Sequence, residues 1–584
     1  MLLKKLTEYS ERQTLPPTGY DNTPIRWIID LNSKFSPPSF VSTTGTSKKN
    51  DRGLIRLAPF RERTSTAIRS KLLADDGEYT FGKAKEGKKG DRKTHASKCN
   101  QDYITLLDAC ARETGVRAID VVRHYLTTWD DTWNPDDFNT DMNFTFRVDG
   151  ELLIDNPKIQ EYWANKFWSL ALEEKDEDED SEEQVYEIKS MECHICGSPC
   201  IPVPRHPFKI KSIPHGQSKG NAIISANKNA FSSYGLVASL IAPTCKVCAE
   251  NYPKAANALL KNEDTHISIG PLVYIFWTKE DTGFSFVSLL SKPEPGDVQT
   301  LIKSAFGGKD VATSIDETPF YATAFSASGA RVVVRDWLET TIAAVKKNLA
   351  RYFLLQKIVE WNGEEGLPIR LYELAAATVP RNKGKPDMKK LTPNIPTIIM
   401  QCALKGQPLP SWLLYQAVKR IKAERDVRKS HAALIKMVMQ SYLSDEIVKE
   451  GKMERLDLTN KEPAYLCGRL LALLESIQWN ALGRTNTTIV DRYYGAASSS
   501  PASVFGPLLR GAQAHLGKLR KNKEAAYIAL QRKLEEIQCD LSSFPKTLNL
   551  EKQGLFALGY YHQRASDRAG AAAHKENQSQ ENEQ

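Results

Sequence analysis

The sequence lacks the features of a membrane or exported protein. No stretch of its 584 residues approaches the roughly 18–20 consecutive apolar residues that a membrane-spanning helix needs. The N-terminal stretch MLLKKLTEYSERQ is too polar after Leu3 for the apolar segment of a secretory signal. We therefore expect a cytoplasmic protein, whose ten cysteines are thiols or metal ligands rather than disulfides.

The sequence also lacks the usual catalytic motifs. None of its ten histidines is followed by Asp, and no H-E-x-x-H is present. Residues 82–89 (GKAKEGKK) fall short of a phosphate-binding loop, because Lys89 stands where Ser or Thr would hold Mg²⁺. Residues 216–220 (GQSKG) match a nucleophile elbow formally, but Pro214 and His215 precede them instead of an apolar strand. We therefore expect a binding protein rather than an enzyme.

Charge is distributed unevenly, although the net charge of +8 is small for this length. Residues 83–98 carry seven Lys or Arg and two acids without apolar periodicity, which predicts an exposed, mobile basic loop. Residues 173–183 (EEKDEDEDSEE) carry nine acids and one lysine. This run is typical of a solvated linker, with mimicry of nucleic acid as the alternative.

The apolar pattern changes class along the chain. Between residues 20 and 335, short apolar runs broken by Gly, Pro and Asn predict strands with interspersed helices, an α+β pattern. These runs are PIRWIID, GLIRLAPF, EYTFG, PLVYIFW, FSFVSLL and GARVVVRDW. Helical spacing dominates from Trp337 onward. The predicted fold is an α+β N-terminal region with a zinc-knuckle insertion, followed by an all-α C-terminal helical bundle.

Composition and pattern divide the chain into six predicted segments. They are an N-terminal α+β domain (1–172), an acidic linker (173–190), a middle α+β segment (191–336), connecting helices (337–391), a helical bundle (392–566) and a disordered tail (567–584). Pro393 and Pro396 predict a hinge near residue 392.

Three apolar stripes mark helices in the C-terminal region, and two sets of basic residues lie around helices of the same region. The stripes are Ile342, Val345, Leu349 and Phe353; Leu414, Ala417, Val418 and Ile421; and Leu466, Leu470, Leu473 and Ile477. The basic sets are Lys419, Arg420, Lys422, Arg425, Arg428 and Lys429, and Lys518, Arg520, Lys521, Lys523, Arg532 and Lys533. Such faces could track a phosphate backbone, or they could be ordinary solubilising charge.

Two cysteine pairs predict a structural metal site. Cys193-x-x-Cys196 and Cys245-x-x-Cys248 have the local spacing of two zinc knuckles, and four thiolates suit tetrahedral Zn²⁺. Four thiolates leave no open position for a catalytic water, so the zinc would be structural. Substitute ligands that the sequence leaves open are Cys200, His194 and His206.

A polar glycine loop follows the first cysteine pair. Its glycines permit close approach to a duplex, its amides can read base edges, and its lysines can neutralise phosphates. The candidate DNA-contacting residues are Gln217, Ser218, Lys219, Gly220, Asn221, Asn227, Lys228 and Asn229, with Lys209 and Lys211 upstream. The alternative is a polar surface loop without such a role.

Several segments in order resemble the large subunit of the type I-C CRISPR surveillance complex, Cascade. They are PIRWIIDLN, LLADDGEYTFG, IPHGQSKGNAIISANKNAFSSYG, PFYATAFSASGARVVVRDW, AYLCGRLLALLESIQ, DRYYGAASSSPASVFGPLL and FPKTLNLEKQGLFALGYYHQR, and they extend over nearly the whole chain. The resemblance implies a subunit at the 5′ end of the CRISPR RNA (crRNA) that recognises the protospacer-adjacent motif in double-stranded DNA.

The resemblance further implies that the subunit promotes R-loop formation, holds the displaced strand and recruits a separate helicase–nuclease. Its implied partners are crRNA, target DNA, and the backbone and crRNA-processing subunits. A small subunit corresponding to the C-terminal part would start internally, at Met437, Met439 or Met453. On this reading Arg61, Arg63, Arg69 and Lys71 would grip the duplex or the crRNA end. The alternative is a stand-alone zinc-containing DNA-binding protein or nuclease.

Overall fold

The computed structural model describes most of the chain as two compact units. The described residues are 1–43, 51–63, 67–85, 92–173, 189–226, 229–232, 234–280, 286–306 and 316–583. The first unit contains residues 1–210 and 219–258, and the second contains residues 211–218 and 259–584. The acidic run, expected as a linker, lies almost entirely outside the described residues, as do Asn227 and Lys228. The six-segment division stays a prediction.

A mixed sheet forms the centre of the first unit. Its strand order is β3 (Ser39–Ser42), β2 (Trp27–Leu31), β6 (Asn143–Val148) and β5 (Ala74–Asp76), and β7 (Glu151–Leu152) also pairs with β6. Strands β2 and β6 are parallel, with Ile29 opposite Phe146, and the other pairs are antiparallel. Both residues are fully buried, because alternate positions of these strands face the core.

Helices and a separate strand pair complete the first unit. The core joins sheet residues to Tyr103 of α3 and Trp163 of α5. The remaining elements are α1 (Leu2–Ser10), β1 (Tyr20–Ile25) paired with β4 (Leu54–Pro59), α2 (Gly77–Phe81), α3 (Arg92–Thr114), α4 (Arg117–Thr127), α5 (Pro157–Glu173), β8 (Met191–Glu192) paired with β9 (Pro199–Cys200), and α6 (Lys246–Lys261).

Two segments predicted as strands are helices. EYTFG lies in α2, because the Asp76 side chain accepts hydrogen bonds from the backbone N–H groups of Glu78 (3.1 Å) and Tyr79 (3.4 Å) and so caps a helix. Gly82, with φ of 66°, ends that helix in the left-handed conformation. The described part of FSFVSLL forms α7 (Phe286–Ser291), which shows that a short apolar run does not distinguish a buried helix from a strand.

The predicted basic loop at 83–98 is also wrong in part. Arg92 to Lys98 open helix α3, and residues 86–91 lie outside the described part. The helix forms because Ala96, Cys99 and Tyr103 are fully buried at helical spacing. The apolar face of α3 is narrow at this end. The surrounding basic residues therefore gave no helical pattern that the sequence could reveal.

The second unit begins with an antiparallel sheet of four strands. Their order is β10 (His266–Ile269), β11 (Leu272–Thr278), β12 (Pro319–Ser328) and β13 (Arg331–Thr341). Alternate residues of β11, such as Tyr274 and Phe276, enter one core with the helices that follow. Buried Asp336 of β13 ties this sheet to those helices, because it accepts hydrogen bonds from Tyr274 (2.9 Å) and Lys405 (2.5 Å).

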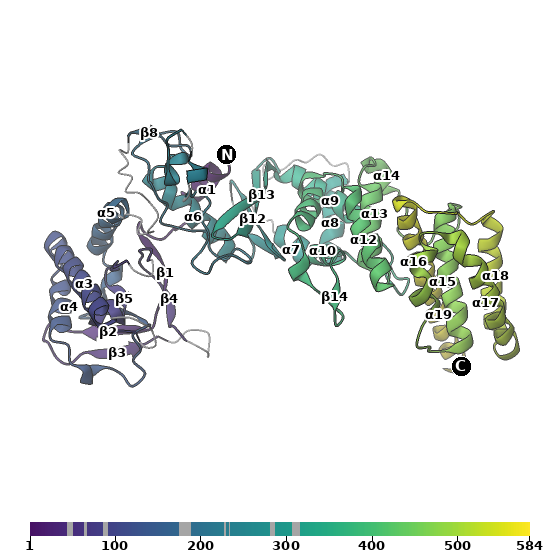
Figure 1. The fold of residues 1–584 in the computed structure, drawn as a ribbon, viewed down its shortest axis with the longest axis horizontal. Coiled ribbons are helices and arrows are strands. Elements are labelled where there is room, and N and C mark those ends of the chain that lie inside the picture. The colour runs from purple at the N-terminus through teal and green to yellow at the C-terminus, as the bar shows by residue number, and fades with distance from the viewer. Residues whose placement is uncertain are drawn as a thin grey trace. The chain divides into compact units, whose positions relative to one another are not determined.

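The rest of the second unit is helical apart from one short strand pair (Figure 1). The three predicted apolar stripes are confirmed in α9, α12 and α15. The elements are α8 (Pro295–Phe306), α9 (Ile342–Gln356), α10 (Leu371–Ala376), β14 (Arg381–Asn382) paired with β15 (Lys385–Pro386), α11 (Asn394–Lys405), α12 (Ser411–Glu424), α13 (Lys429–Gln440), α14 (Asp445–Lys449), α15 (Pro463–Leu482), α16 (Ile489–Ala497), α17 (Pro501–Asn522), α18 (Glu524–Asp540) and α19 (Leu550–Glu583). The predicted fold class, α+β followed by a helical region, is confirmed.

Two further predictions concern this unit. Pro393 and Pro396, expected to mark a hinge, lie at the start of α11, where a missing N–H costs no helical hydrogen bond, and the hinge itself stays a prediction. Residues from Asp567 onward, expected to form a disordered tail, continue α19. Asp567 accepts hydrogen bonds from Lys533 (2.7 Å) and Gln563 (3.0 Å), so this part of the helix is anchored to α18.

Helices α15 and α19 lie side by side and cross at two glycines (Figure 1). A Cβ added to Gly468 would lie 2.0 Å from the carbonyl oxygen of Phe556, and one added to Gly559 would lie 2.2 Å from that of Tyr465. Both distances are far below van der Waals contact, and the obstacle is backbone. Any side chain at either position would therefore push the helices apart.

We predict that Gly468→Ala lowers the free energy of unfolding by about 2 kcal/mol or more, because neither backbone can yield without moving a whole helix. The matched control is Gly517→Ala on the exposed face of α17, where an added Cβ meets nothing within 4 Å. It should raise stability by up to about 1 kcal/mol through helix propensity. Urea unfolding of both variants measures the difference; equal effects would contradict the close crossing.

Lys436 of α13 is fully buried and closes the C-terminal end of α9. Its Nζ donates hydrogen bonds to the carbonyl oxygens of Leu354 (3.1 Å) and Lys357 (2.8 Å), and Glu454 lies 4.0 Å away. Burial lowers the pKa of Lys436 to about 8, which the neighbouring Glu454 only partly opposes. The folded protein therefore releases this proton at a lower pH than the unfolded chain does.

The sign of the resulting pH dependence follows from this lowered pKa. An unfolded lysine titrates near 10.5, so stability should rise between about pH 8 and pH 10.5, where the unfolded chain still binds the proton. We predict that the free energy of unfolding of the protein, relative to Lys436→Met, rises across this window by on the order of 3 kcal/mol. Chemical unfolding at several pH values tests this, and a constant difference would show that Lys436 is not desolvated.

Candidate metal centre and nucleic-acid surfaces

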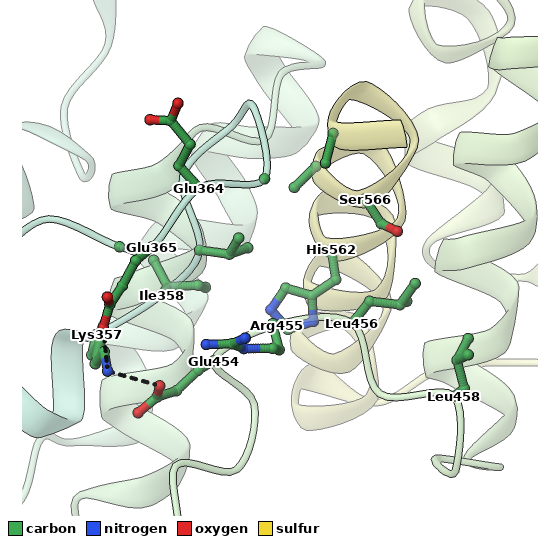
Figure 2. Close-up of a pocket in the computed structure, with 15 residues that line it drawn as sticks. Lys357, Ile358, Glu364, Glu365, Glu454, Arg455, Leu456, Leu458, His562 and Ser566 are labelled. Atoms are coloured by element: carbon green, nitrogen blue, oxygen red, sulfur yellow. Dashed lines mark ion pairs between the residues drawn. The ribbon is translucent and has the colours of Figure 1, made fainter. Parts of the chain in front are cut away.

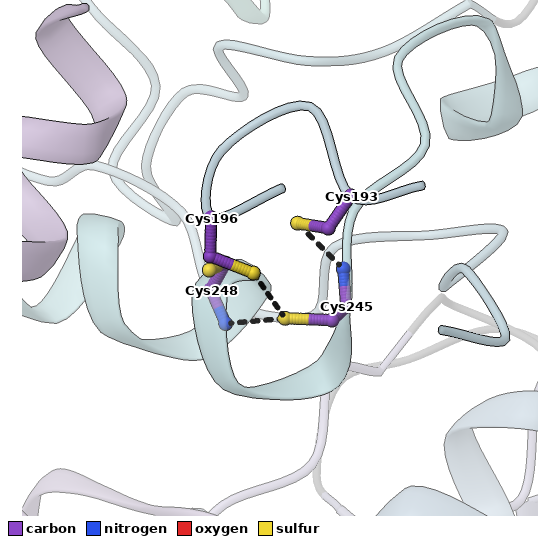
Figure 3. Close-up of side chains that lie close together, drawn as sticks. All are labelled: Cys193, Cys196, Cys245 and Cys248. Carbon is purple, nitrogen blue, oxygen red and sulfur yellow. Dashed lines mark hydrogen bonds between the residues drawn. The ribbon is translucent and has the colours of Figure 1, made fainter. Parts of the chain in front are cut away.

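The four predicted cysteines form one cluster. Their Sγ atoms all lie within 4.8 Å of one another, and those of Cys196 and Cys245 are 3.9 Å apart (Figure 3). A tetrahedral ion with metal–sulfur bonds of about 2.3 Å needs sulfurs about 3.8 Å apart. The set can therefore hold a metal ion, as the spacing of the two cysteine pairs predicts.

Two local structures present the thiols. Cys193 and Cys196 lie on the turn of the β8–β9 hairpin, where the N–H of Gly197 donates to the carbonyl of Cys193 (2.8 Å). Cys245 precedes α6 and Cys248 lies in its first turn. The N–H groups of Cys245 and Cys248 point at Cys193 Sγ (3.3 Å) and Cys245 Sγ (3.4 Å). Backbone N–H groups directed at sulfur stabilise thiolates.

Burial and hydrogen bonding affect the thiols differently. A backbone hydrogen bond from Ser198 lowers the pKa of Cys196 to about 6, whereas burial raises the pKa of Cys245 to about 11. Among the described residues, the cluster contains only the four predicted cysteines. The substitute ligands that the sequence left open, Cys200, His194 and His206, do not join it. His206 instead shares a 2.8 Å hydrogen bond with Tyr252, and burial lowers its pKa to about 4.

The cysteine cluster anchors a helix that holds two other segments of the first unit. Glu250 of α6 accepts a hydrogen bond from the N–H of Gly19 (3.0 Å), and Lys254 donates to the carbonyl of Pro17 (2.9 Å). Further along α6, Asn257 donates to the carbonyl of Lys209 (2.9 Å). The helix therefore positions both the N-terminal segment and the start of the glycine loop.

We predict that the protein binds about one equivalent of metal, and that Cys245→Ser with Cys248→Ser lowers this to near zero, because two thiolates hold the ion too weakly. Elemental analysis of freshly purified protein measures the metal content. The matched control is Cys539→Ser, an exposed thiol of α18, which should leave it unchanged. Less than about half an equivalent in the parent protein would contradict the site.

The glycine loop is closed at its base by an antiparallel bridge. Ile210 and Asn221 exchange backbone hydrogen bonds of 3.0 and 2.8 Å, and Asn221 is buried. Gln217, Ser218 and Lys219 are exposed at the tip, and Gly220 has a φ of 96° that only glycine adopts readily. No strand enters Ser218 and no helix leaves it, so the context of a nucleophile elbow is missing there.

The positions of the other candidate residues in and near the loop say less about DNA contact. Asn229 starts a short 3₁₀ helix at Asn229–Phe231, and its side chain is not described. Lys209 pairs with Glu62, and Lys211 is half-buried. Lys219 Nζ lies 3.4 Å from the carbonyl oxygen of Arg63, which brings the loop tip next to the segment that carries the N-terminal arginines.

The predicted N-terminal basic residues are largely engaged within the protein. Arg63 pairs with Asp75 and Asp76 and stacks on Tyr79, with its guanidinium carbon 3.6 Å from the ring centroid. Arg69 is buried and donates to the carbonyl of Glu62 (2.9 Å). Arg61 is half-buried, and burial lowers the pKa of Lys71. The structure therefore gives Arg63 and Arg69 structural partners, and their contact with nucleic acid stays a prediction.

The two basic sets of the second unit differ in how many of their side chains form hydrogen bonds or ion pairs within the protein. In the first set, Lys422 donates to Ser499 (2.7 Å), Arg428 pairs with Glu424 (2.7 Å), and Lys429 pairs with Glu360. Lys419 and Arg425 are exposed, Arg420 is half-buried, and the exposed aromatic rings of Trp412 and Tyr415 share helix α12 with Lys419. Exposed aromatic and basic side chains on one helix are typical of single-strand binding.

Half of the second set lies on α17. This helix carries no acid over its 22 residues, and Lys518, Arg520 and Lys521 are exposed near its end. Arg532 and Lys533 belong to α18 and pair with Glu536 and Asp567. The acid-free face of α17 is therefore the clearest uncompensated basic surface among the predicted sets.

A cavity of about 530 Å³ lies where α19 meets the segments around Lys357 and Glu454 (Figure 2). Its charges are balanced, since Lys357 pairs with Glu365 (3.1 Å) and Glu454 (3.6 Å). Burial and the nearby Lys436 lower the pKa of His562 to about 3, so its imidazole stays neutral at physiological pH. His562 Nδ1 is 3.0 Å from the hydroxyl of Tyr465, which assigns this histidine to the α15–α19 contact.

Comparison with known proteins places this architecture in a class. Residues 3–567 match the model of a family of CRISPR-associated proteins. The match extends over nearly the whole chain, and the chain therefore belongs to the family of the CRISPR-associated protein Cas_Csd1. A comparison with curated proteins found no match. Among the described residues, no helix has both the length and the hydropathy required to cross a bilayer.

Proposed function

We propose that this protein is the large subunit of a type I-C crRNA-guided surveillance complex in the cytoplasm. It recognises the protospacer-adjacent motif in duplex DNA, promotes R-loop formation, stabilises the non-target strand and helps recruit a helicase–nuclease. Membership of a CRISPR-associated family over residues 3–567 carries the proposal. The partners are crRNA, target DNA, the backbone and crRNA-processing subunits, and a small subunit that corresponds to the C-terminal part.

The motif-reading role is assigned to the glycine loop. Gln217, Ser218 and Lys219 are the exposed polar residues at its tip, and the Ile210–Asn221 bridge holds its base. An amide can form bidentate hydrogen bonds with an adenine edge, and an ammonium can neutralise a phosphate. The loop is anchored on an α6 helix that begins at the cysteine cluster, which supports a tip held in a defined position.

The metal of the cluster is zinc in this proposal. Four thiolates in tetrahedral arrangement are the donor set that structural zinc prefers, and they leave no coordination position for substrate. Zinc would join the hairpin turn to the start of α6 and so stabilise the first unit. DNA cleavage is then performed by the separate helicase–nuclease, and this chain acts by binding.

The stand-alone alternative predicts different experimental results from the guided complex. A zinc-containing nuclease would cleave DNA alone and would lose this activity in Ser218→Ala, whereas a stand-alone DNA-binding protein would purify without RNA of uniform length. The family match over residues 3–567 supports the guided complex over either alternative.

We predict that Gln217→Ala with Lys219→Ala weakens binding of the assembled complex to motif-bearing duplex by about 10- to 100-fold, because one base contact and one phosphate contact are lost. Complex assembly should be unchanged. Electrophoretic mobility shifts on duplexes with and without the motif measure the effect. Lys158→Ala, an exposed lysine of α5 outside the loop, is the control.

Two outcomes would contradict the assignment. Equal affinity of the variant and the parent complex for motif-bearing duplex would remove the reading role from the loop. An equal loss in the Lys158→Ala control would show that the effect is general electrostatics rather than a contact of the loop tip.

A further inference from the structure

A small basic cavity with an exposed tryptophan lies on the second unit and shares only Arg428 and Lys429 with the basic sets described above. It encloses about 240 Å³, and its lining includes four cations and one carboxylate; the cations are Arg428, Lys429, Arg564 and Arg568, and the carboxylate is Asp426. Trp361 forms its rim and is 59% exposed. The exposed indole therefore lies beside clustered guanidinium groups, with which an aromatic face interacts favourably.

The four cations are not equally neutralised. Arg428 and Lys429 pair with Glu424 and Glu360, and Arg564 lies 3.5 Å from Glu475. Within the described ranges, Arg568 contacts Trp361 and lies within ion-pair distance of no carboxylate. Its guanidinium nitrogen is 3.4 Å from the Trp361 carbonyl oxygen, and its carbon is 5.3 Å from the indole centroid.

The two arginines of α19 also repel each other. Arg564 and Arg568 are one helical turn apart and both face this cavity. Burial and the charge of Arg564 lower the pKa of Arg568, which means that its positive charge is disfavoured where it stands. An anion between the two guanidinium groups would remove that repulsion and form charge-assisted hydrogen bonds.

The size of the cavity restricts the anion. A volume of about 240 Å³ is below the roughly 300 Å³ at which pockets for drug-sized ligands begin, so it suits a single phosphate group or one base rather than a free dinucleotide. A stacking partner is available at the rim. A phosphate against arginines and a base against an aromatic ring is the mode by which single strands bind.

We infer that the cavity holds one nucleotide of single-stranded nucleic acid, with its phosphate between Arg564 and Arg568 and its base stacked on Trp361. The inference deepens the proposed function and rests on it. It adds a defined anchoring point to a surface that otherwise holds the strand by general charge. The guanidinium groups fix the position of one phosphate, and the indole accepts any base.

The test is the binding of a fluorescein-labelled oligothymidylate to the full-length protein at several salt concentrations. Arg568→Gln should weaken binding about tenfold and lower the slope of log affinity against log salt by about 0.7, the value of one released counterion on a single strand. Trp361→Ala should weaken binding by about 5- to 100-fold through lost stacking, with the slope unchanged. The two variants therefore distinguish the phosphate contact, whose loss lowers the salt slope, from base stacking, whose loss lowers the affinity alone.

Two controls keep the test interpretable. Arg492→Gln removes an exposed arginine of α16 that belongs to neither basic set, and it should alter neither affinity nor slope. Trp361→Phe retains an aromatic platform and should recover most of the affinity that Trp361→Ala loses. An oligouridylate arm shows whether the strand is DNA or RNA. Circular dichroism of each variant confirms that it is folded.

The outcomes are distinct from those of the motif-reading experiment. Equal affinity and slope in the parent and Arg568→Gln would overturn the inference while leaving motif recognition intact. Binding of an acidic peptide that depends on Arg568, without binding of either oligonucleotide, would identify a protein ligand and would also overturn it. Failure of the complex to bind motif-bearing duplex would instead overturn the proposed function.

Discussion

The cluster of four cysteines is the constraint on which the functional part of the first unit depends. It brings a hairpin turn at Cys193–Cys196 and the first turn of α6 together across a long stretch of chain. Helix α6 then holds the N-terminal segment through Glu250 and Lys254 and the start of the glycine loop through Asn257. The four sulfurs could hold a metal ion, which would join these two segments of the chain.

The second unit is organised by a different constraint, the contact of two helix backbones at Gly468 and Gly559. The motif GYYHQR lies here, and its side chains serve the packing. Tyr560 donates to Glu475 (2.7 Å), Tyr561 donates to the carbonyl of Val359 (2.8 Å), and Gln563 accepts from Arg469 (3.1 Å). The side chains of this segment thus serve the packing of the helices, and Arg564 also faces a cavity.

Much of this could be predicted where the signal is local. The cysteine pairs predict their own cluster, and apolar residues at helical spacing predict α9, α12 and α15. The predictions fail where local chemistry competes with pattern. Asp76 and Gly82 cap a helix inside a segment rich in β-formers, and the short apolar run of α7 forms a buried helix instead of a strand.

The sequence could not predict which groups the charged side chains would pair with. Arg63 appears as a free cation in the sequence, yet it pairs with Asp75 and Asp76, more than ten residues away. The opposite holds for Arg568, which was assigned to a disordered tail and lies instead against Trp361. Ion pairing depends on tertiary contacts, so a basic residue in a sequence predicts a binding surface only weakly.

The central claim is that the exposed tip of the glycine loop contacts the DNA duplex next to the region paired with the guide. The most direct measurement is a cryo-electron microscopy structure of the assembled complex on motif-bearing DNA. The account predicts that Gln217 lies within hydrogen-bonding distance of a base edge of the motif and that Lys219 lies beside a phosphate. A structure in which this loop is buried against another subunit, away from the DNA, would contradict it.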